Sequence, residues 1–403
     1  MHEHFDGHRA FIHIEKLAAM RRFPGSPGEA QARAYIRGVG DATGVPMREE
    51  EFGYSTAPLV VVLPLVCALL GLVSLAGSLL YLWGSRLAIV PGAVLLVLIF
   101  VGLRWSAAFE TFGARGTRNR SANVVGRIAA AHEPAGTVVL SAHYDAKSQV
   151  MPVVVRAGLF IVGFASATVL GLALLIAGAL ALAGFDVLGS RVAFYLSLLP
   201  SVCLFLLVFN FTGNRSAGAL DNAAGEAVIL EAARVLAENP PGNMDVVVAS
   251  FGCEEVGLIG SIQYLLAHEE ELKSRPCFML NYDIPFTMSG NLYLNTAFEF
   301  PAVETSPRLN ALARRAAADM GIEMKGIYMP VGAAADHMPW VKHGIEATGF
   351  VSAATYIHST RDDIDRINRE GLRRSGEMAL RIVAMLDRRL AEEAAAPQES
   401  QPG

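Results

Sequence analysis

The sequence predicts an α/β fold in which a mixed, mostly parallel central sheet is flanked by helices and interrupted by four inserted transmembrane helices. The chain has 403 residues, of which 53% are hydrophobic and only 18% are charged, whereas charged residues make up ~25% of an ordinary globular chain. The deficit of charge lies in two blocks, residues 54–105 and 151–213. The rest of the chain alternates strand-like with helix-like segments, which is typical of a parallel sheet covered by helices on both faces.

Both apolar blocks contain uncharged stretches of the length of a membrane span. These stretches are residues 52–85, 87–103, 157–185 and 192–214. A helix needs ~20 mostly apolar residues to cross a bilayer, so each block predicts one transmembrane hairpin. The alternative is two buried hairpins of a soluble core, which the remaining protein is too small to cover. Tyr81, Trp83 and Trp105 lie where interfacial aromatic residues are expected. No charged residue lies inside a span, which disfavours a transporter.

The basic residues predict the side of the membrane on which the polar segments lie. Because both insertions are hairpins, all polar segments share one side. Near the span ends that side carries Arg104, Arg115, Arg118, Arg120, Lys147, Arg156 and Arg215. The far side carries only Arg86 and Arg191. The protein is therefore expected to be a multi-pass integral membrane protein with its polar domain in the cytoplasm.

The predicted organisation is one discontinuous domain with two insertions and a tail. The domain comprises residues 1–53, 105–155 and 213–393, the hairpins residues 54–104 and 156–212, and the disordered tail residues 394–403. The first fifty residues contain no apolar signal core, so no cleavable signal peptide is expected. The four cysteines show no disulfide framework. The net charge of −5 gives no reason to expect a nucleic-acid partner.

Within the polar segments, short β-branched runs alternate with amphipathic patterns. Strands are expected to end near residue 52 and to cover residues 122–128, 137–142, 245–251, 277–282 and 345–351. Helices are expected over residues 8–22, 27–42, 223–238, 257–272, 307–320 and 371–393. Asp221 or Asn222 fits the N-cap of the helix at 223, and Pro240-Pro241 closes it.

Acidic and imidazole side chains follow the predicted strands, at the sheet edge where such folds bind ligands. They are His143 and Asp145, Glu254 and Glu255, Asp283, Tyr356 and His358, with Asp221 before a helix. Each alone has an ordinary explanation, such as a structural histidine, a helix cap or a solvated glutamate pair. Together, the carboxylates would raise each other's pKa unless a cation neutralised them. Two histidines and three carboxylates suit zinc, which binds nitrogen and oxygen ligands.

The order and local sequence of these residues resemble the two-zinc aminopeptidases (clan MH, family 28 metallopeptidases). The matching motifs are His143-Tyr-Asp145, Ala219-Leu-Asp221-Asn222-Ala-Ala-Gly225, Glu254-Glu255-Val-Gly257-Leu-Ile-Gly260-Ser261, Asn281-Tyr-Asp283 and His358-Ser-Thr-Arg-Asp362-Asp363. The segment from Ala335-Asp336-His337 to Gly344-Ile345 is also similar. The resemblance covers nearly all of the polar sequence and implies a zinc-exopeptidase-like fold.

The resemblance also implies a role for each residue. Asp221 would bridge two Zn2+ ions per chain, with His143 and Asp283 completing one site, and Glu255 and His358 the other. Glu254 would be the general base, and Asp145 would hold His143 in its correct tautomer. Many family members carry a Tyr directly before the last ligating His, where it can stabilise the tetrahedral intermediate. Here Tyr356 lies two residues before His358, and the same role is predicted for it.

The function predicted from these features is a membrane-embedded zinc exopeptidase that removes N-terminal residues from small peptides. Its expected partners are a peptide substrate and the lipid bilayer, and exposed hairpins could pack between subunits of a homo-oligomer. Because the second hairpin lies between Asp145 and Asp221, the active-site face is expected near the bilayer. The alternatives are a related zinc amide hydrolase, a glutaminyl-cyclase-like acyl transferase binding one zinc, and a non-catalytic membrane scaffold on the same fold.

Overall fold

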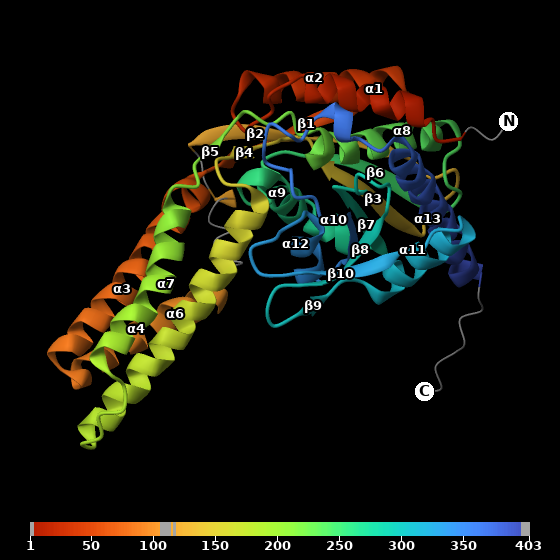
Figure 1. Ribbon diagram of the computed structural model, residues 1–403. Helices are drawn as coiled ribbons and strands as arrows, with labels where there is room; N and C mark the ends of the chain where they lie inside the picture. The colour runs from red at the N-terminus through yellow and green to blue at the C-terminus, as the bar shows by residue number, and fades with distance from the viewer. Residues whose placement is uncertain (1–3, 105–113, 116–117, 396–403) are drawn as a thin grey trace, which may run out of the picture. The chain divides into compact units, whose positions relative to one another are not determined.

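The computed structural model describes residues 4–104, 114–115 and 118–395 of the chain (Figure 1). The chain forms two compact units, each assembled from separate segments of sequence. The first, called here the α/β unit, draws on residues 1–54, 114–148 and 214–403. The second, called the helical unit, draws on residues 55–113 and 149–213.

A mixed sheet forms the centre of the α/β unit. Its strands, in spatial order, are β1 (Met47–Tyr54), β2 (Asn119–Ile128), β6 (Met244–Phe251), β3 (Gly136–His143), β7 (Cys277–Asp283), β11 (Glu346–Val351), β8 (Tyr293–Phe298) and β10 (Lys325–Met329), with β9 (Val303–Glu304) paired to β8. The four central strands β6, β3, β7 and β11 are mutually parallel. Antiparallel pairs of β1 with β2, β2 with β6, and β8 with β11 extend the sheet on both sides. The predicted fold class, an α/β fold with a mixed, mostly parallel central sheet, is confirmed.

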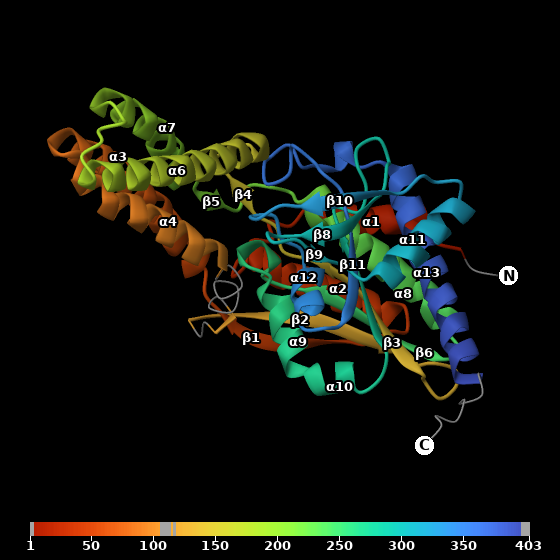
Figure 2. The same cartoon turned by 90° about the horizontal axis from the view of Figure 1, so that it is seen from below.

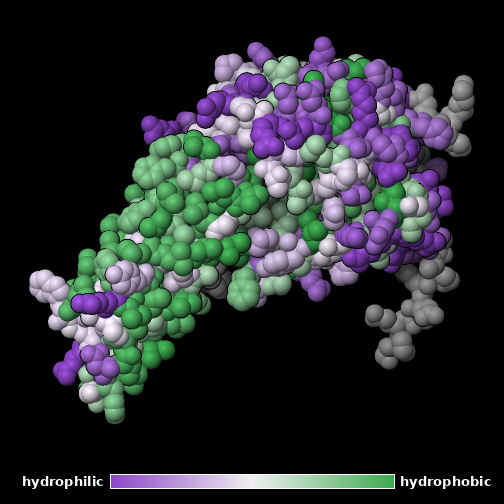
Figure 3. Space-filling view, viewed as in Figure 1, coloured by the Kyte–Doolittle hydropathy of each residue, from purple (hydrophilic) through white to green (hydrophobic). Residues whose placement is uncertain are grey.

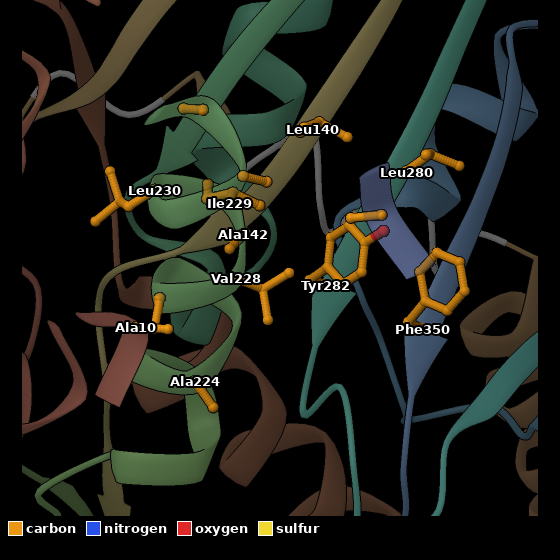
Figure 4. Packing of buried hydrophobic residues seen from close by; sticks show 14 of the residues in the cluster. Ala10, Leu140, Ala142, Ala224, Val228, Ile229, Leu230, Leu280, Tyr282 and Phe350 are labelled. Carbon is orange, nitrogen blue, oxygen red and sulfur yellow. The ribbon is translucent and has the colours of Figure 1, made fainter. Parts of the chain in front are cut away.

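Helices cover both faces of this sheet (Figure 1), and Figure 2 shows the same layers from below. One face carries α1 (Gly7–Ala18), α2 (Pro27–Ala42), α8 (Ala224–Glu238), α11 (Pro307–Asp319) and α13 (Arg369–Ala395). The other carries α9 (Ile259–Ala267), α10 (Glu269–Lys273) and α12 (His337–Lys342). Because neighbouring strand residues point to opposite faces, Leu140 joins the core under α8 and Val139 joins the core under α9. Figure 4 shows Ala142 of β3 near Val228 of α8, with Leu140 farther along the same strand.

The structure differs from the predicted elements at a few places. The helix expected over 257–272 is divided into α9 and α10, because α9 ends at Ala267 and the next residue, His268, has non-helical φ and ψ angles. Strands β8 and β10 were not predicted, because their sequences do not show the regular alternation of apolar and polar residues that marks a strand. Helix α13 continues to Ala395, beyond the expected start of the tail at residue 394. The rest of the predicted tail lies outside the described residues.

The helical unit consists of four long apolar helices. They are α3 (Leu63–Trp83), α4 (Ile89–Arg104), α6 (Val153–Leu182) and α7 (Ser190–Val208), and a short π-helix, Pro58–Val62, leads into α3. Taken with the short helical turns that precede α3 and α4, four helical segments are long and apolar enough to cross a membrane: Pro58–Trp83, Ser85–Gly102, Val153–Leu182 and Ser190–Val208. Large side chains such as Val90 (67% exposed) and Ile161 (64% exposed) point outward, and Figure 3 shows this apolar surface in green. Glycines allow close packing inside, as where Gly92 of α4 meets the backbone of Gly171 on α6.

The structure describes two of the three aromatic residues expected at a membrane interface, and only one of them is exposed. Trp83 is 88% exposed, as an interfacial residue requires. Tyr81 is buried instead, and its hydroxyl donates to the carbonyl of Leu188 at 2.6 Å and to Asp186 at 3.1 Å. Tyr81, in the last turn of α3, therefore links the first hairpin to the turn of the second. Trp105 lies outside the described residues.

Candidate metal centre

The α/β unit brings together all five side chains that the sequence analysis selected as metal ligands. His143 and Asp283 are the last residues of the parallel neighbours β3 and β7. Glu255 follows β6, His358 follows β11, and Asp221 lies in the segment that leads into α8. Their ligand atoms form two groups, each with its atoms within 4.8 Å of one another: His143, Asp221 and Asp283, and Asp221, Glu255 and His358. We call these two groups together the metal cluster.

Asp221 belongs to both groups, and its two carboxylate oxygens face different histidines. Its Oδ1 lies 3.3 Å from Nε2 of His143, and its Oδ2 lies 3.1 Å from Nε2 of His358. Each histidine also faces a second carboxylate: Asp283 Oδ1 lies 3.5 Å from His143 Nε2, and Glu255 Oε2 lies 3.2 Å from His358 Nε2. A single carboxylate, that of Asp221, is thus shared by both groups of candidate ligands.

The spacing and chemistry of these atoms fit zinc. With Zn–N and Zn–O bonds of ~2.0–2.1 Å in a tetrahedron, neighbouring ligand atoms lie about 3.3 Å apart. The four imidazole–carboxylate separations of 3.1–3.5 Å match that edge length. Each group offers one imidazole nitrogen and two carboxylates, a mixed donor set that leaves room for a further ligand, as catalytic zinc sites require.

The hydrogen bonding of His143 points to the same conclusion. Its Nδ1 donates to the backbone carbonyl of Asp145 at 3.2 Å, which leaves Nε2 without a proton in the neutral imidazole. Nε2 is buried and has no hydrogen-bond partner among the residues that the structure describes. A buried polar atom without a partner is costly, and a metal ion between Nε2 and the carboxylates would remove that cost.

Without a metal ion, the buried carboxylates of the cluster repel one another and are only partly compensated by the two imidazoles. Burial would lower the pKa of His143, but the surrounding carboxylates outweigh it and hold the pKa well above its ordinary value. Burial raises the pKa of Glu254 well above its ordinary value, reinforced by Asp283 and opposed by His143. Burial would likewise raise the pKa of Asp221, but the two imidazoles beside it lower that pKa. Protons are therefore shared unevenly among these groups, and divalent cations would compensate the same negative charge.

Glu254 lies beside the metal cluster without belonging to either group. Its Oε2 is 3.7 Å from His143 Nε2, and the residue is 9% exposed. Glu254 and Glu255 lie in a short 3-10 turn after β6, preceded by Cys253 in the left-handed backbone region at φ 59°. The turn aims the two neighbouring carboxylates at different partners, since Glu255 faces His358 and Glu254 faces His143.

Asp145 contacts both His143 and the turn that follows β6. Its carboxylate accepts the backbone N–H groups of Glu254 and Glu255, both at 3.1 Å. Its Oδ1 lies 3.6 Å from Nδ1 of His143, beyond hydrogen-bond distance. Asp145 thus orients His143 through its backbone carbonyl, while its side chain fixes the turn that carries Glu254 and Glu255.

Two supporting residues received no role from the sequence. The buried carboxylate of Asp362 accepts the backbone N–H groups of Leu220 and Asp221, at 2.8 and 3.2 Å. Burial, reinforced by Asp221, raises the pKa of Asp362 to about 7. Lys147 places its ammonium 2.8 Å from Glu255 Oε2. Both residues lie within four positions of a ligand, and that proximity is the one signal by which the sequence could have identified them.

Tyr356 has an environment different from that of the ligands. Its ring lies in the core of the α/β unit beneath the guanidinium of Arg366, 5.0 Å from the ring centroid. Burial raises the pKa of Tyr356 to about 12. Its hydroxyl is buried and has no hydrogen-bond partner within the described part of the chain. The role in stabilising an intermediate stays a prediction for this residue.

Part of the chain is similar in sequence to known peptidases. The model of peptidase family M28 matches residues 202–383. Aminopeptidase YwaD of Bacillus subtilis (strain 168) is 30% identical over 173 residues, which are 40% of this chain and 36% of that protein. The aligned region thus spans about a third of the length of this curated relative.

Solved structures with the same fold include enzymes of two kinds. BSAP, a zinc aminopeptidase from Bacillus subtilis, superposes with a TM-score of 0.56 at 15% identity, covering 95% of each chain. A glutaminyl cyclase from Bacteroides thetaiotaomicron bound to N-acetylhistamine superposes with a TM-score of 0.56 at 12% identity, covering 95% of this chain and 99% of that one. At these identities the likeness concerns the fold. Over residues 202–383 the chain is thus similar to the M28 peptidases, and it has the fold shared by zinc aminopeptidases and glutaminyl cyclases.

Proposed function

We propose that this protein is a membrane-embedded zinc exopeptidase that removes residues from the amino ends of small peptides. The observation that carries the proposal is the position of Asp221, whose two oxygens face His143 and His358 separately. A carboxylate shared in this way suits two metal ions close together, and paired ions of this kind serve hydrolysis. The relationship to aminopeptidases supports the choice of the amino end.

The proposed ligands are divided between two zinc ions. His143 and Asp283 would hold one ion, Glu255 and His358 the other, and Asp221 would bridge them. When bound, the two ions lower the pKa of water and polarise a carbonyl group. Glu254 takes the proton of the attacking water on its carboxylate. As the C–N bond breaks, Glu254 delivers that proton to the leaving amine, which restores its starting state.

The position and electrostatics of Glu254 support its role as general base. Its carboxylate lies beside the metal cluster, and its pKa is raised by burial and by the neighbouring Asp283. A base with a raised pKa both accepts and returns a proton readily near neutral pH. Glu255, next in sequence, has the opposite tendency, because Lys147 and His358 outweigh burial and bring its pKa to about 2. This difference favours Glu255 as a ligand and Glu254 as the base.

The four helices of the helical unit would anchor the protein as membrane spans. Their length, hydropathy and outward-facing apolar side chains support this. The excess of basic residues near the span ends on the polar side favours a cytoplasmic α/β unit. The second segment of the helical unit begins at Gln149, only a few residues after Asp145 in the chain. We therefore expect small or membrane-proximal peptides as substrates, and efficient trimming of large soluble proteins would count against this expectation.

A second candidate function is acyl transfer of the glutaminyl-cyclase type. It is favoured by the superposition on glutaminyl cyclases, which is as close as that on zinc aminopeptidases. The number of metal ions separates the two candidates, because a cyclase needs one zinc and the proposed hydrolysis needs two. The full set of ligands in both groups favours the peptidase.

Metal analysis and a substrate panel on the purified full chain in detergent test both candidates. The expected result is about two zinc ions per chain and release of the first residue from dipeptides and aminoacyl anilides. N-acetylated peptides of the same sequence should resist cleavage. One zinc per chain together with cyclisation of glutaminyl peptides would overturn the peptidase in favour of the cyclase.

A further inference from the structure

The side chain of Asn222, the residue after the bridging Asp221, ties two parts of the metal cluster together. Asn222 is fully buried. Its Nδ2 donates to the backbone carbonyl of Tyr282 at 2.7 Å, and its Oδ1 accepts the backbone N–H of Ile284 at 3.3 Å. Tyr282 and Ile284 are the residues on either side of Asp283. One amide therefore holds the peptide groups that flank the second ligand of the His143 group.

The same amide also fixes the start of α8. Its Oδ1 accepts the N–H of Gly225, at 3.0 Å, in the first turn of that helix. Gly225 has no side chain, and a methyl group there would overlap both the carbonyl oxygen of Tyr282 and Oδ1 of Asn222. The absence of a side chain at Gly225 is what allows α8 to approach the end of β7 closely enough for the amide to reach across. Asn222 and Gly225 therefore act together to hold the start of α8 against the end of β7.

The other group of the metal cluster is held by different contacts. Glu255 is fixed through its backbone N–H by Asp145 and through its carboxylate by Lys147. The backbone of Asp221 itself is fixed by Asp362. In the described part of the chain, the Asn222 side chain hydrogen-bonds to the residues on either side of Asp283 and to the first turn of α8. Glu255 and His358 are contacted by other side chains and by each other.

We propose that Asn222 is a positioning residue that sets the spacing of Asp221 and Asp283, and so controls metal affinity in the group His143–Asp221–Asp283 selectively. The proposal rests on the proposed metal-dependent function. Loss of a partner that orients a ligand costs about 10- to 100-fold in metal affinity. Asn222→Ala should weaken this group by that factor and leave the group Asp221–Glu255–His358 within about threefold of wild type, since its anchors are untouched.

The test measures zinc affinity by competition with a chelating dye, using the full chain in detergent. Asn222→Ala is introduced into two backgrounds, His358→Ala and His143→Ala, each of which leaves one group intact. The fall in affinity is expected in the His358→Ala background only. Gly225→Ala, which keeps the amide but displaces the helix, should give the same pattern. The matched control is Asn310→Ala, since Asn310 is a buried amide that bonds Thr305 and Thr348 instead.

The outcomes separate this proposal from the proposed function. Equal weakening in both backgrounds, or the same weakening by Asn310→Ala, means a general loss of structure and overturns the role of Asn222. Unchanged affinity in the His358→Ala background overturns it as well. A wild-type chain that binds no zinc overturns both proposals, whereas a zinc-binding wild type without this selectivity overturns only the role of Asn222. Circular dichroism of each metal-free variant shows whether it is folded.

Discussion

Lys147 holds Glu255 at both carboxylate oxygens. Its ammonium Nζ lies 2.8 Å from Oε2, and its backbone N–H donates to Oε1 at 3.1 Å. The ammonium also donates to the backbone carbonyl of Glu255 at 3.0 Å. A buried carboxylate thus has a cation fixed beside it before any metal arrives, which keeps Glu255 ionised and in a single orientation.

Removing this cation should destabilise the metal-free protein. Burial alone would raise the pKa of Glu255, but Lys147 and His358 bring it to about 2. A folded-state pKa below the unfolded value contributes stability that is present above about pH 4.5 and is lost as the pH falls toward 2. Lys147→Met should therefore lower the free energy of unfolding at pH 7 by about 3 kcal/mol, the usual cost of breaking a buried pair. The difference from wild type should shrink below pH 4.5.

Urea denaturation with a chelator present, at pH 7 and at pH 3, measures this effect. Lys273→Met is the control, because Lys273 pairs with Glu269 on the surface and its loss should leave stability unchanged. A Lys147→Met protein as stable as wild type at pH 7 would show that the pair contributes nothing to stability.

Glu254→Gln should separate metal binding from catalysis. Glutamine has the shape of glutamate but cannot accept the proton of water, so kcat should fall by about 10²- to 10⁴-fold. Zinc content should be unchanged, because Glu254 belongs to neither metal group. Steady-state kinetics and elemental analysis of the same preparation give both numbers. Wild-type activity in this variant would remove Glu254 from the mechanism.

Substitutions of the carboxylate ligands should differ in the number of metal ions lost. Asp221→Ala removes a ligand from both groups, whereas Asp283→Ala removes one from the His143 group alone. After dialysis, Asp221→Ala should retain little zinc, and Asp283→Ala should retain about one ion per chain. Equal losses in the two variants would argue against a bridging role for Asp221.

Zinc should also stabilise the fold, because it binds the native cluster and not the unfolded chain. At a free concentration one hundred times Kd, one ion contributes about 2.7 kcal/mol. The Tm of the chelated wild type should rise on adding zinc, and the rise should be absent in Asp221→Ala. Addition of magnesium is a control for ionic strength, since Mg2+ prefers six oxygen ligands.

The sequence predicted which residues gather in the metal cluster because their signal is local. His143, Asp283 and Glu255 each stand at or just after a strand, and a parallel sheet brings such ends to one edge. The supporting contacts were not predictable in the same way. That Asn222 reaches Tyr282, 60 residues away, depends on how closely α8 approaches β7, which no pattern in either segment reveals. The same holds for the buried position of Tyr81, which only the packing of two hairpins determines.

Labelling of single cysteines in intact cells tests the sidedness proposed from the basic residues. The four native cysteines are all buried, so background labelling by a membrane-impermeant maleimide should be low. Val187, which is 59% exposed in the turn of the second hairpin, is replaced by Cys to report on the far side. Ser274→Cys, on the exposed surface after α10, reports on the α/β unit. With a cytoplasmic α/β unit, Val187→Cys should react in intact cells and Ser274→Cys only after permeabilisation, because the bilayer separates the two. The reverse pattern would place the metal cluster outside the cell and would show that the excess of positive charge is overridden by translocation of a folded domain.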